Sequence, residues 1–135
     1  MIVSHWREGQ SLCVWPGVFH LTRVNNTGAA FGMLKGSGTL LAMISIVCVL
    51  ASAVALLRGF FLKSTSSGLD AGFRNFGLTL VAAGAAGNLY DRLRFGYVID
   101  FLDFRIWPVF NVADSGICVG IFLMILSLMK PGKNS

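Results

Sequence analysis

The chain has 135 residues, of which 55% are hydrophobic and 13% are charged, so it is too apolar for an ordinary soluble domain of this size. Its net charge of +5 does not indicate a nucleic-acid-binding protein, because the eleven Lys and Arg residues are scattered singly among apolar runs. The composition predicts a small integral membrane protein whose basic residues meet anionic lipid headgroups.

Residues 1–35 are the first predicted element, a small β and loop region at the membrane surface. Arg7 and Arg23 interrupt its apolar patches, so the segment can neither span a membrane nor form the core of a signal peptide. Residues 18–24 alternate in polarity, as a strand does, and the turn-forming sequence NNTG follows them. From its neighbours alone, Asn26 is interpreted as a turn residue.

Three apolar segments are predicted to be transmembrane helices, at about 37–57, 73–91 and 111–129. The first carries no charge and is long enough to cross a hydrocarbon core of roughly 30 Å. The second is rich in small residues, which let neighbouring helix backbones approach, as Ala83 and Gly87 at a four-residue spacing would. The predicted fold class is an all-α polytopic membrane protein, one membrane-embedded domain over the whole chain with a small surface β element.

The distribution of basic residues does not determine how these helices are oriented in the membrane. Five of them lie on the side of the connection 58–74 and six on the other side, so the positive-inside rule does not determine the orientation. That connection contains the run STSSG and is predicted to be a solvated loop. Tyr90, Tyr97 and Trp107 cluster between the second and third helices, which predicts that the chain there lies at the membrane interface.

Cysteine and histidine residues give no indication of a metal site. Cys13, Cys48 and Cys118 are widely spaced and odd in number, and we interpret them as small buried hydrophobic side chains. His5 and His20 are isolated, and no metal-ligand spacing links them to a cysteine or a carboxylate.

Candidate chemistry is concentrated in residues 87–115, which hold four of the five aspartates beside strongly apolar segments. Asn111 is predicted to cap the third helix and to place Asp114 in its first turn, near the positive end of the helix. Asp114 is then either an ordinary helix-start acid or a functional carboxylate, since ionisable groups at membrane depth are costly and usually functional.

Asp100 is the second candidate, because apolar residues flank it on both sides. If Asp100 and Asp114 converge, they would share one proton, since two adjacent like charges in a low dielectric cannot both ionise. One carboxylate could act as a general base on water and the other as a general acid. The spacing alone leaves this pairing open. Asp103 would point to the opposite side of an extended chain and is not assigned to the pair.

Asn88, Asp91 and Arg92 are spaced to share one face at the end of the second helix. One interpretation is an internal ion pair between Asp91 and Arg92. The other is that the planar guanidinium of Arg92 orients a substrate carbonyl or a headgroup phosphate.

Five segments carry a resemblance to a known family: PGVFHLT at 16–22, NTGAAF at 26–31, GNLYDR at 87–92, VIDF at 98–101 and FNVAD at 110–114. They cover most of the chain in the family's order, and with them the chain resembles the bacterial lipoprotein signal peptidases, also called signal peptidase II or prolipoprotein signal peptidases. The resemblance implies a multi-pass aspartic endopeptidase of the bacterial inner membrane that uses no metal or cofactor. Such an enzyme removes the signal peptide of a prolipoprotein by cleaving before the diacylglyceryl-modified cysteine.

The resemblance implies that Asp100 and Asp114 are the catalytic pair. The residues that it implies for lining or orienting the site are Asn26, Asn88, Arg92 and Asn111. It further implies a site that faces the periplasmic or extracellular side, prolipoprotein and membrane phospholipid as partners, and a monomer. The arginines that it places on that side, where some would meet lipid phosphates, are Arg23, Arg92, Arg94 and Arg105.

One departure from the family's pattern concerns the start of the chain. Family members normally begin with an additional transmembrane helix that carries an Asp-Gln-x-x-Lys type motif, and this sequence starts just after the point where that helix would end. This departure leaves open an inactive truncated family member. A separate alternative is a small transporter or proton-conducting protein in which Asp91 and Asp114 relay protons.

Overall fold

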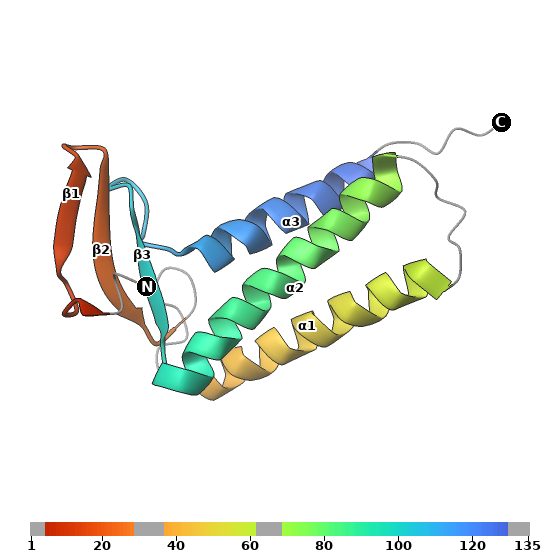
Figure 1. The fold of residues 1–135 in the computed structure, drawn as a ribbon, viewed down its shortest axis with the longest axis horizontal. Coiled ribbons are helices and arrows are strands. Elements are labelled where there is room, and N and C mark those ends of the chain that lie inside the picture. Colours follow the sequence, from red (N-terminus) through yellow and green to blue (C-terminus); the bar gives the residue numbers. More distant parts are fainter. Residues whose placement is uncertain (1–4, 29–36, 62–68, 130–135) are drawn as a thin grey trace.

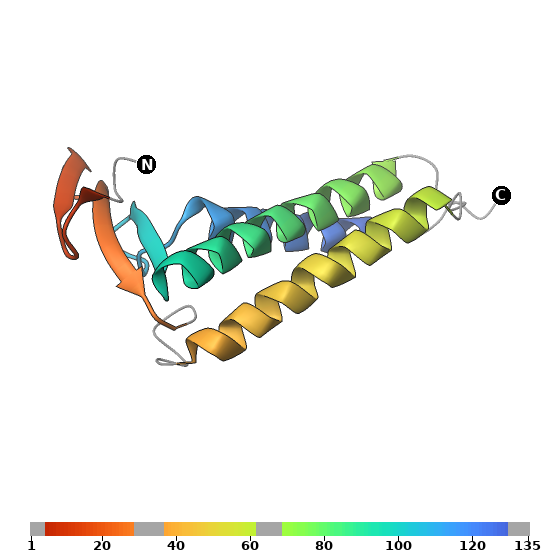
Figure 2. The same cartoon turned by 60° about the horizontal axis from the view of Figure 1, so that its bottom comes forward.

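The structure, a computed structural model, describes residues 5–28, 37–61 and 69–129. Its elements in chain order are β1 (Ser11–Trp15), β2 (Phe19–Asn26), α1 (Gly38–Phe61), α2 (Leu69–Phe95), β3 (Val98–Asp103) and α3 (Val112–Met129). Helix α2 packs against both α1 and α3. The three strands form a small sheet at one end of the helices (Figures 1 and 2).

Each of the three predicted helical segments is helical, and the first two are longer than predicted. Helix α1 continues to Phe61 and α2 begins at Leu69, so the loop predicted at 58–74 is shorter; its residues 62–68 lie outside the described ranges. Charged residues stabilise both of these extended helix ends. Arg58 lies in the last turn of α1 and Asp70 in the first turn of α2, where each charge complements the helix dipole.

Helices α1 and α3 are long and apolar enough to cross a membrane, over Gly38–Phe60 and Val112–Met129. Only 17% and 6% of these two segments are buried inside the protein, so the rest of the chain does not cover their apolar side chains. An apolar helix that is left uncovered in this way requires an apolar solvent. The two helices therefore indicate a membrane protein.

Glycines bring α2 and α3 into close contact. A Cβ atom on Gly77 would lie 2.6 Å from the carbonyl oxygen of Gly120, and one on Gly84 would overlap the carbonyl oxygen of Ala113. No larger residue fits either position without moving a helix. The two helices can therefore approach to backbone contact.

The prediction that Ala83 and Gly87 mediate this approach is wrong for Ala83, which is exposed. A Cβ on Gly87 would meet the Ala113 side chain at 3.4 Å, a looser contact than at Gly84. The contact residues are offset from the predicted ones because the apolar composition of α2 is similar on all its faces, and sequence alone does not show which face meets α3.

The sheet has the order β1-β2-β3, with both pairs antiparallel. The predicted β element at the N-terminus is confirmed by β1 and β2, whereas residues 29–35 of that predicted region lie outside the described ranges. Strand β3 is not predicted as part of the sheet, although the chain from Asp100 to Asp103 is interpreted as extended. Its sequence VIDFLD contains two aspartates, which are depleted in strands, and it is completed by pairing with a segment far away in the chain.

The chain returns from β3 to α3 beside the same strand. The backbone N–H groups of Phe101 and Leu102 donate to the carbonyl oxygen of Phe110, at 2.9 and 2.7 Å, and Phe110 donates back to Leu102 at 3.1 Å. This bridge places Asn111 and the first turn of α3 next to β3.

Cysteines are less buried than predicted. Cys13 and Cys118 are exposed, and Cys48 is half-buried. Cys13 lies on the edge strand β1, and Cys118 lies on a face of α3 that the rest of the protein leaves uncovered.

The variant Gly84→Ala is expected to lower the unfolding temperature of the detergent-solubilised protein. The added methyl group would push α2 and α3 apart, at a cost of about 1–3 kcal/mol. Gly72→Ala on the same helix is the matched control, because nothing lies within 4 Å of its added Cβ and alanine is the better helix former. Equal unfolding temperatures of the two variants would contradict the close packing.

Candidate active site

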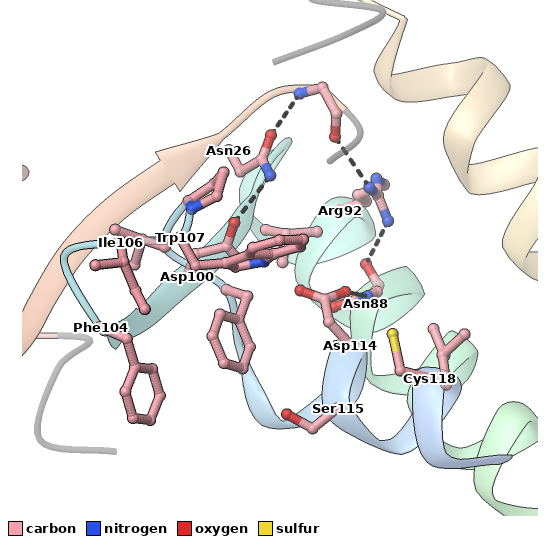
Figure 3. A pocket seen from close by; sticks show the side chains of 16 residues that line it. Asn26, Asn88, Arg92, Asp100, Phe104, Ile106, Trp107, Asp114, Ser115 and Cys118 are labelled. Carbon is pink, nitrogen blue, oxygen red and sulfur yellow. Dashed lines mark hydrogen bonds between the residues drawn. The ribbon is translucent and has the colours of Figure 1, made fainter. Parts of the chain in front are cut away.

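Five polar side chains from distant parts of the chain meet where the sheet joins the helices. Figure 3 draws those of Asn26, Asn88, Asp100 and Asp114. Asn26 ends β2, Asp100 lies in β3, and Asn88 lies near the end of α2. Asn111 immediately precedes α3, and Asp114 lies in its first turn.

Asp100 is buried, with 2% of its surface exposed, and both its oxygens accept hydrogen bonds from side-chain amides. Asn26 Nδ2 donates to one oxygen at 2.8 Å, and Asn111 Nδ2 donates to the other at 2.7 Å. Neutral donors therefore hold this carboxylate from two sides.

Asp114 and Asn111 bond to each other reciprocally. The backbone N–H of Asp114 donates to Asn111 Oδ1 at 3.0 Å, and the backbone N–H of Asn111 donates to Asp114 Oδ2 at 3.2 Å. This is the capping-box arrangement, so the predicted N-cap at Asn111 is confirmed. The second carboxylate oxygen of Asp114 accepts from Asn88 Nδ2 at 2.8 Å.

Asn88 and Asn111 join the two carboxylates into one network. Asn111 Nδ2 donates to Asn88 Oδ1 at 3.1 Å as well as to Asp100. Asp100 and Asp114 are thus linked through the two amides. Because every amide oxygen in the network also accepts an N–H, the orientation of each carboxamide is fixed.

Burial raises the pKa of Asp100 to about 6. The hydrogen bonds from Asn26 and Asn111 oppose this shift, because they favour the charged form, whereas the negative charge of Asp114 adds to it. Asp100 can therefore gain or lose a proton near neutral pH, as a group that transfers protons must.

Arg92 and Asn26 connect the network to the end of β2. Arg92 donates to the carbonyl oxygens of Gly28 at 3.3 Å and of Asn88 at 3.4 Å. Asn26 Oδ1 accepts from the backbone N–H of Gly28 at 2.9 Å, so Asn26 is a turn residue, as predicted, while its Nδ2 contacts Asp100.

Asp91 and Asp103 have other partners. Asp91 Oδ2 accepts from the backbone N–H of Ile99 at 3.1 Å, a bond that connects β3 to α2. Within the described ranges, Asp91 forms no ion pair with Arg92. Asp103 accepts from Thr22 Oγ1 at 2.7 Å and lies outside the Asp100 network, as expected for the opposite side of the strand. Burial alone would raise the pKa of Asp103. The bonds from Thr22 and Arg105, with the charge of Arg105, outweigh burial and lower it.

A cavity of about 770 Å³ opens beside the two carboxylates, and Asp100 and Asp114 both line it. Arg92 and Asn26 line the same cavity. Its apolar wall comes from the loop 104–110, including Phe104, Ile106 and Trp107, and from Ile117 and Cys118 of α3 (Figure 3). Sequence reasoning did not assign these residues to a cavity wall, although the apolar run IWPVF at 106–110 was a signal for them.

The arrangement combines two linked carboxylates with an apolar binding space. It can therefore hold an apolar chain while it exchanges protons with a carbonyl group and a water molecule. In the three described ranges, no three His, Cys, Asp or Glu side chains group in a way that could hold a metal ion.

Comparison with known proteins gives consistent results. The sequence profile of the family described as Signal peptidase (SPase) II matches residues 1–130. The lipoprotein signal peptidase of Halothermothrix orenii is 41% identical over 133 residues, which are 98% of this chain and 86% of the relative. That of Pelotomaculum thermopropionicum is 43% identical over 129 residues, 95% and 79% of the two chains. A solved bacterial membrane enzyme superposes with a TM-score of 0.81 at 35% identity, over 99% of this chain and 79% of the other.

The pKa of Asp100 is expected to respond in opposite directions to two substitutions. Asn26→Ala should raise it, because a donor to the charged form is lost, and Asp114→Asn should lower it, because a like charge is lost. Carbon-13 NMR of labelled aspartate carboxyl groups, assigned with Asp100→Asn, measures both changes. Shifts in the same direction would contradict the network.

The same pKa also links folding stability to pH. The value of about 6 in the folded protein lies above the value of about 3.9 for an unfolded aspartate. The contribution of Asp100 to stability is therefore fully present below about pH 4 and is lost as the pH rises through about 6.

Proposed function

The chain belongs to the signal peptidase II family, and on this basis we propose that it is an aspartic endopeptidase in which Asp100 and Asp114 are the catalytic pair. It removes the signal peptide from prolipoproteins by cleaving before the diacylglyceryl-modified cysteine. The observation that carries the proposal is that both carboxylates share one amide network and line one largely apolar cavity.

The two carboxylates hold one proton between them and use it in turn. The ionised partner takes a proton from water as the water oxygen attacks the scissile carbonyl carbon, and the protonated partner donates to the carbonyl oxygen. In the second step the C–N bond breaks as the leaving nitrogen takes a proton from the pair, and one hydroxyl of the tetrahedral intermediate returns its proton to the pair, which again holds one proton. The products are the carboxyl end of the signal peptide and a new amino group on the cysteine.

The neighbouring polar residues orient this pair and the substrate. Asn88 and Asn111 fix the two carboxylates relative to each other, and Asn26 fixes Asp100 from the side of β2. Arg92 lines the cavity beside them, where its guanidinium can bind a substrate carbonyl or a headgroup phosphate.

The protein works as one membrane-embedded domain and as a monomer in the bacterial inner membrane. Helices α1, α2 and α3 all span: α2 has 27 residues and is therefore about 40 Å long. The sheet end, with the site, faces the periplasmic or extracellular side. Tyr90 and Trp107 are exposed near that end, where aromatic side chains suit a membrane interface.

Replacing either catalytic carboxylate should abolish cleavage. We expect Asp100→Asn and Asp114→Asn to lower the rate on a diacylglyceryl-modified precursor peptide by roughly a thousandfold or more, because each removes a proton-transfer group. Glu8→Gln is the control with the same chemical change, since Glu8 is exposed and its amide variant can still accept from Asn25. Unfolding temperatures check that the variants fold. Cleavage by either aspartate variant at more than about a tenth of the wild-type rate would rule out the pair.

The pH dependence of kcat/KM should have a falling alkaline limb. Above the pKa of about 6 the free enzyme loses the proton that the pair shares, so kcat/KM falls as the pH rises. Asn26→Ala should move this limb to higher pH, since it raises the pKa of Asp100. A limb that stays in place would show that Asp100 does not hold the shared proton.

A further inference from the structure

The loop 104–110 forms the apolar wall of the cavity, and two fixed ends hold it in place. Its C-terminal end is hydrogen-bonded to β3 through the backbone of Phe110. Its apex is open, with 92% of Ile106 and 59% of Trp107 exposed. The position of the wall therefore depends on how the loop leaves β3 at its beginning.

That beginning is a tight turn centred on Arg105. The backbone N–H of Ile106 donates to the carbonyl oxygen of Phe104 at 2.7 Å, and Arg105 has a φ of +66°. A three-residue turn with a positive φ at a non-glycine centre is rare and strained. An arginine at a position where glycine would be less strained indicates that contacts of its side chain offset the strain of the turn.

The Arg105 side chain is fastened at two points. Its Nε donates to His20 Nδ1 at 3.1 Å, and its Nη1 lies 3.5 Å from Asp103 Oδ2. Its backbone N–H also donates to Asp103 Oδ1 at 3.0 Å. Asp103 is itself buried and held by Thr22 of β2, so the turn is anchored to two strands. His20 can accept this bond only as the neutral imidazole with Nδ1 unprotonated.

His20, Asp103 and Arg105 are not among the residues that line the cavity. They act on it only through the loop. Phe104 transmits the position of the turn to the wall, because its ring packs against Phe19 with centroids 4.9 Å apart and against Phe110 with centroids 5.9 Å apart.

We propose that Arg105 is a positioning residue: its bonds to Asp103 and His20 fix the loop 104–110 as the apolar wall, and so set how tightly the apolar part of the substrate is held. The proposal rests on the proposed peptidase function of the cavity. It assigns Arg105 to substrate affinity and leaves the chemical step to the carboxylates.

Steady-state kinetics on the lipid-modified peptide test this assignment. Arg105→Ala retains the Cβ and removes the fastening, so we expect KM to rise about tenfold, the equivalent of one hydrogen bond to a charged group, while kcat stays within about twofold. Arg7→Ala is the control, since Arg7 is also an exposed arginine and lies before β1. A fall in kcat at constant KM, or unchanged kinetics with a lower unfolding temperature only, would overturn the proposal.

His20 provides a rescue experiment. His20→Ala should raise KM as Arg105→Ala does, whereas His20→Asn should restore the wild-type KM, because the asparagine Oδ1 offers an acceptor close to the position of Nδ1. His20→Ala also leaves the contacts of Arg105 with Asp103 in place, so it tests the proposal if Arg105→Ala does not fold. Equal KM values for His20→Ala and His20→Asn would contradict it.

Fluorescence of Trp107 follows the wall without requiring activity. In a Trp6→Phe, Trp15→Phe background Trp107 is the remaining one of three tryptophans. Arg105→Ala and His20→Ala should change its emission and its quenching by acrylamide, and His20→Asn should not. Unchanged emission with normal cleavage would refute the wall proposal alone. If the variants change the emission but the chain with native Arg105 and His20 cleaves no lipopeptide, the proposed function is refuted, while the role of Arg105 in positioning the loop is supported.

Discussion

One carboxamide, that of Asn111, determines the geometry of the site. Its oxygen caps α3 at Asp114, and its nitrogen donates both to Asp100 on β3 and to Asn88 on α2. The side chain that caps the third helix is therefore the same one that links the two carboxylates. A helix cap is worth about 1 kcal/mol. Here it also aligns three elements, α2, β3 and α3.

The choice of amides as partners explains how Asp100 keeps a useful proton affinity. A cation bonded directly to a buried carboxylate would hold it permanently ionised, whereas neutral donors offset only part of the cost of burial. Asp103 shows the contrast within the same strand. Two differences lower its pKa while that of Asp100 is raised: Thr22 and Arg105 stabilise its charged form, and burial acts on it less than on Asp100.

Local chemistry predicted much of this molecule. Long apolar runs with few charges predicted the helices, and the spacing of Asn111 and Asp114 predicted the cap. The resemblance to a family, drawn from short motifs, singled out the aspartates that line the cavity. Features that depend on distant partners were missed: β3 forms by pairing with β2, and the glycines at 77 and 84 matter only because α3 crosses there. The turn at Arg105 contradicts local preference, so no propensity could indicate it.

The pairing of β2 with β3 has a consequence for how the protein matures. Asn26 and Asp100 are 74 residues apart, and α1 and α2 lie between them in the chain. Closing so long a loop is slow and follows the formation of local structure. Helices α1 and α2 precede β3 in the chain, and Asn111 follows it. The two carboxylates are therefore brought together only once the first turn of α3 has formed beside β3.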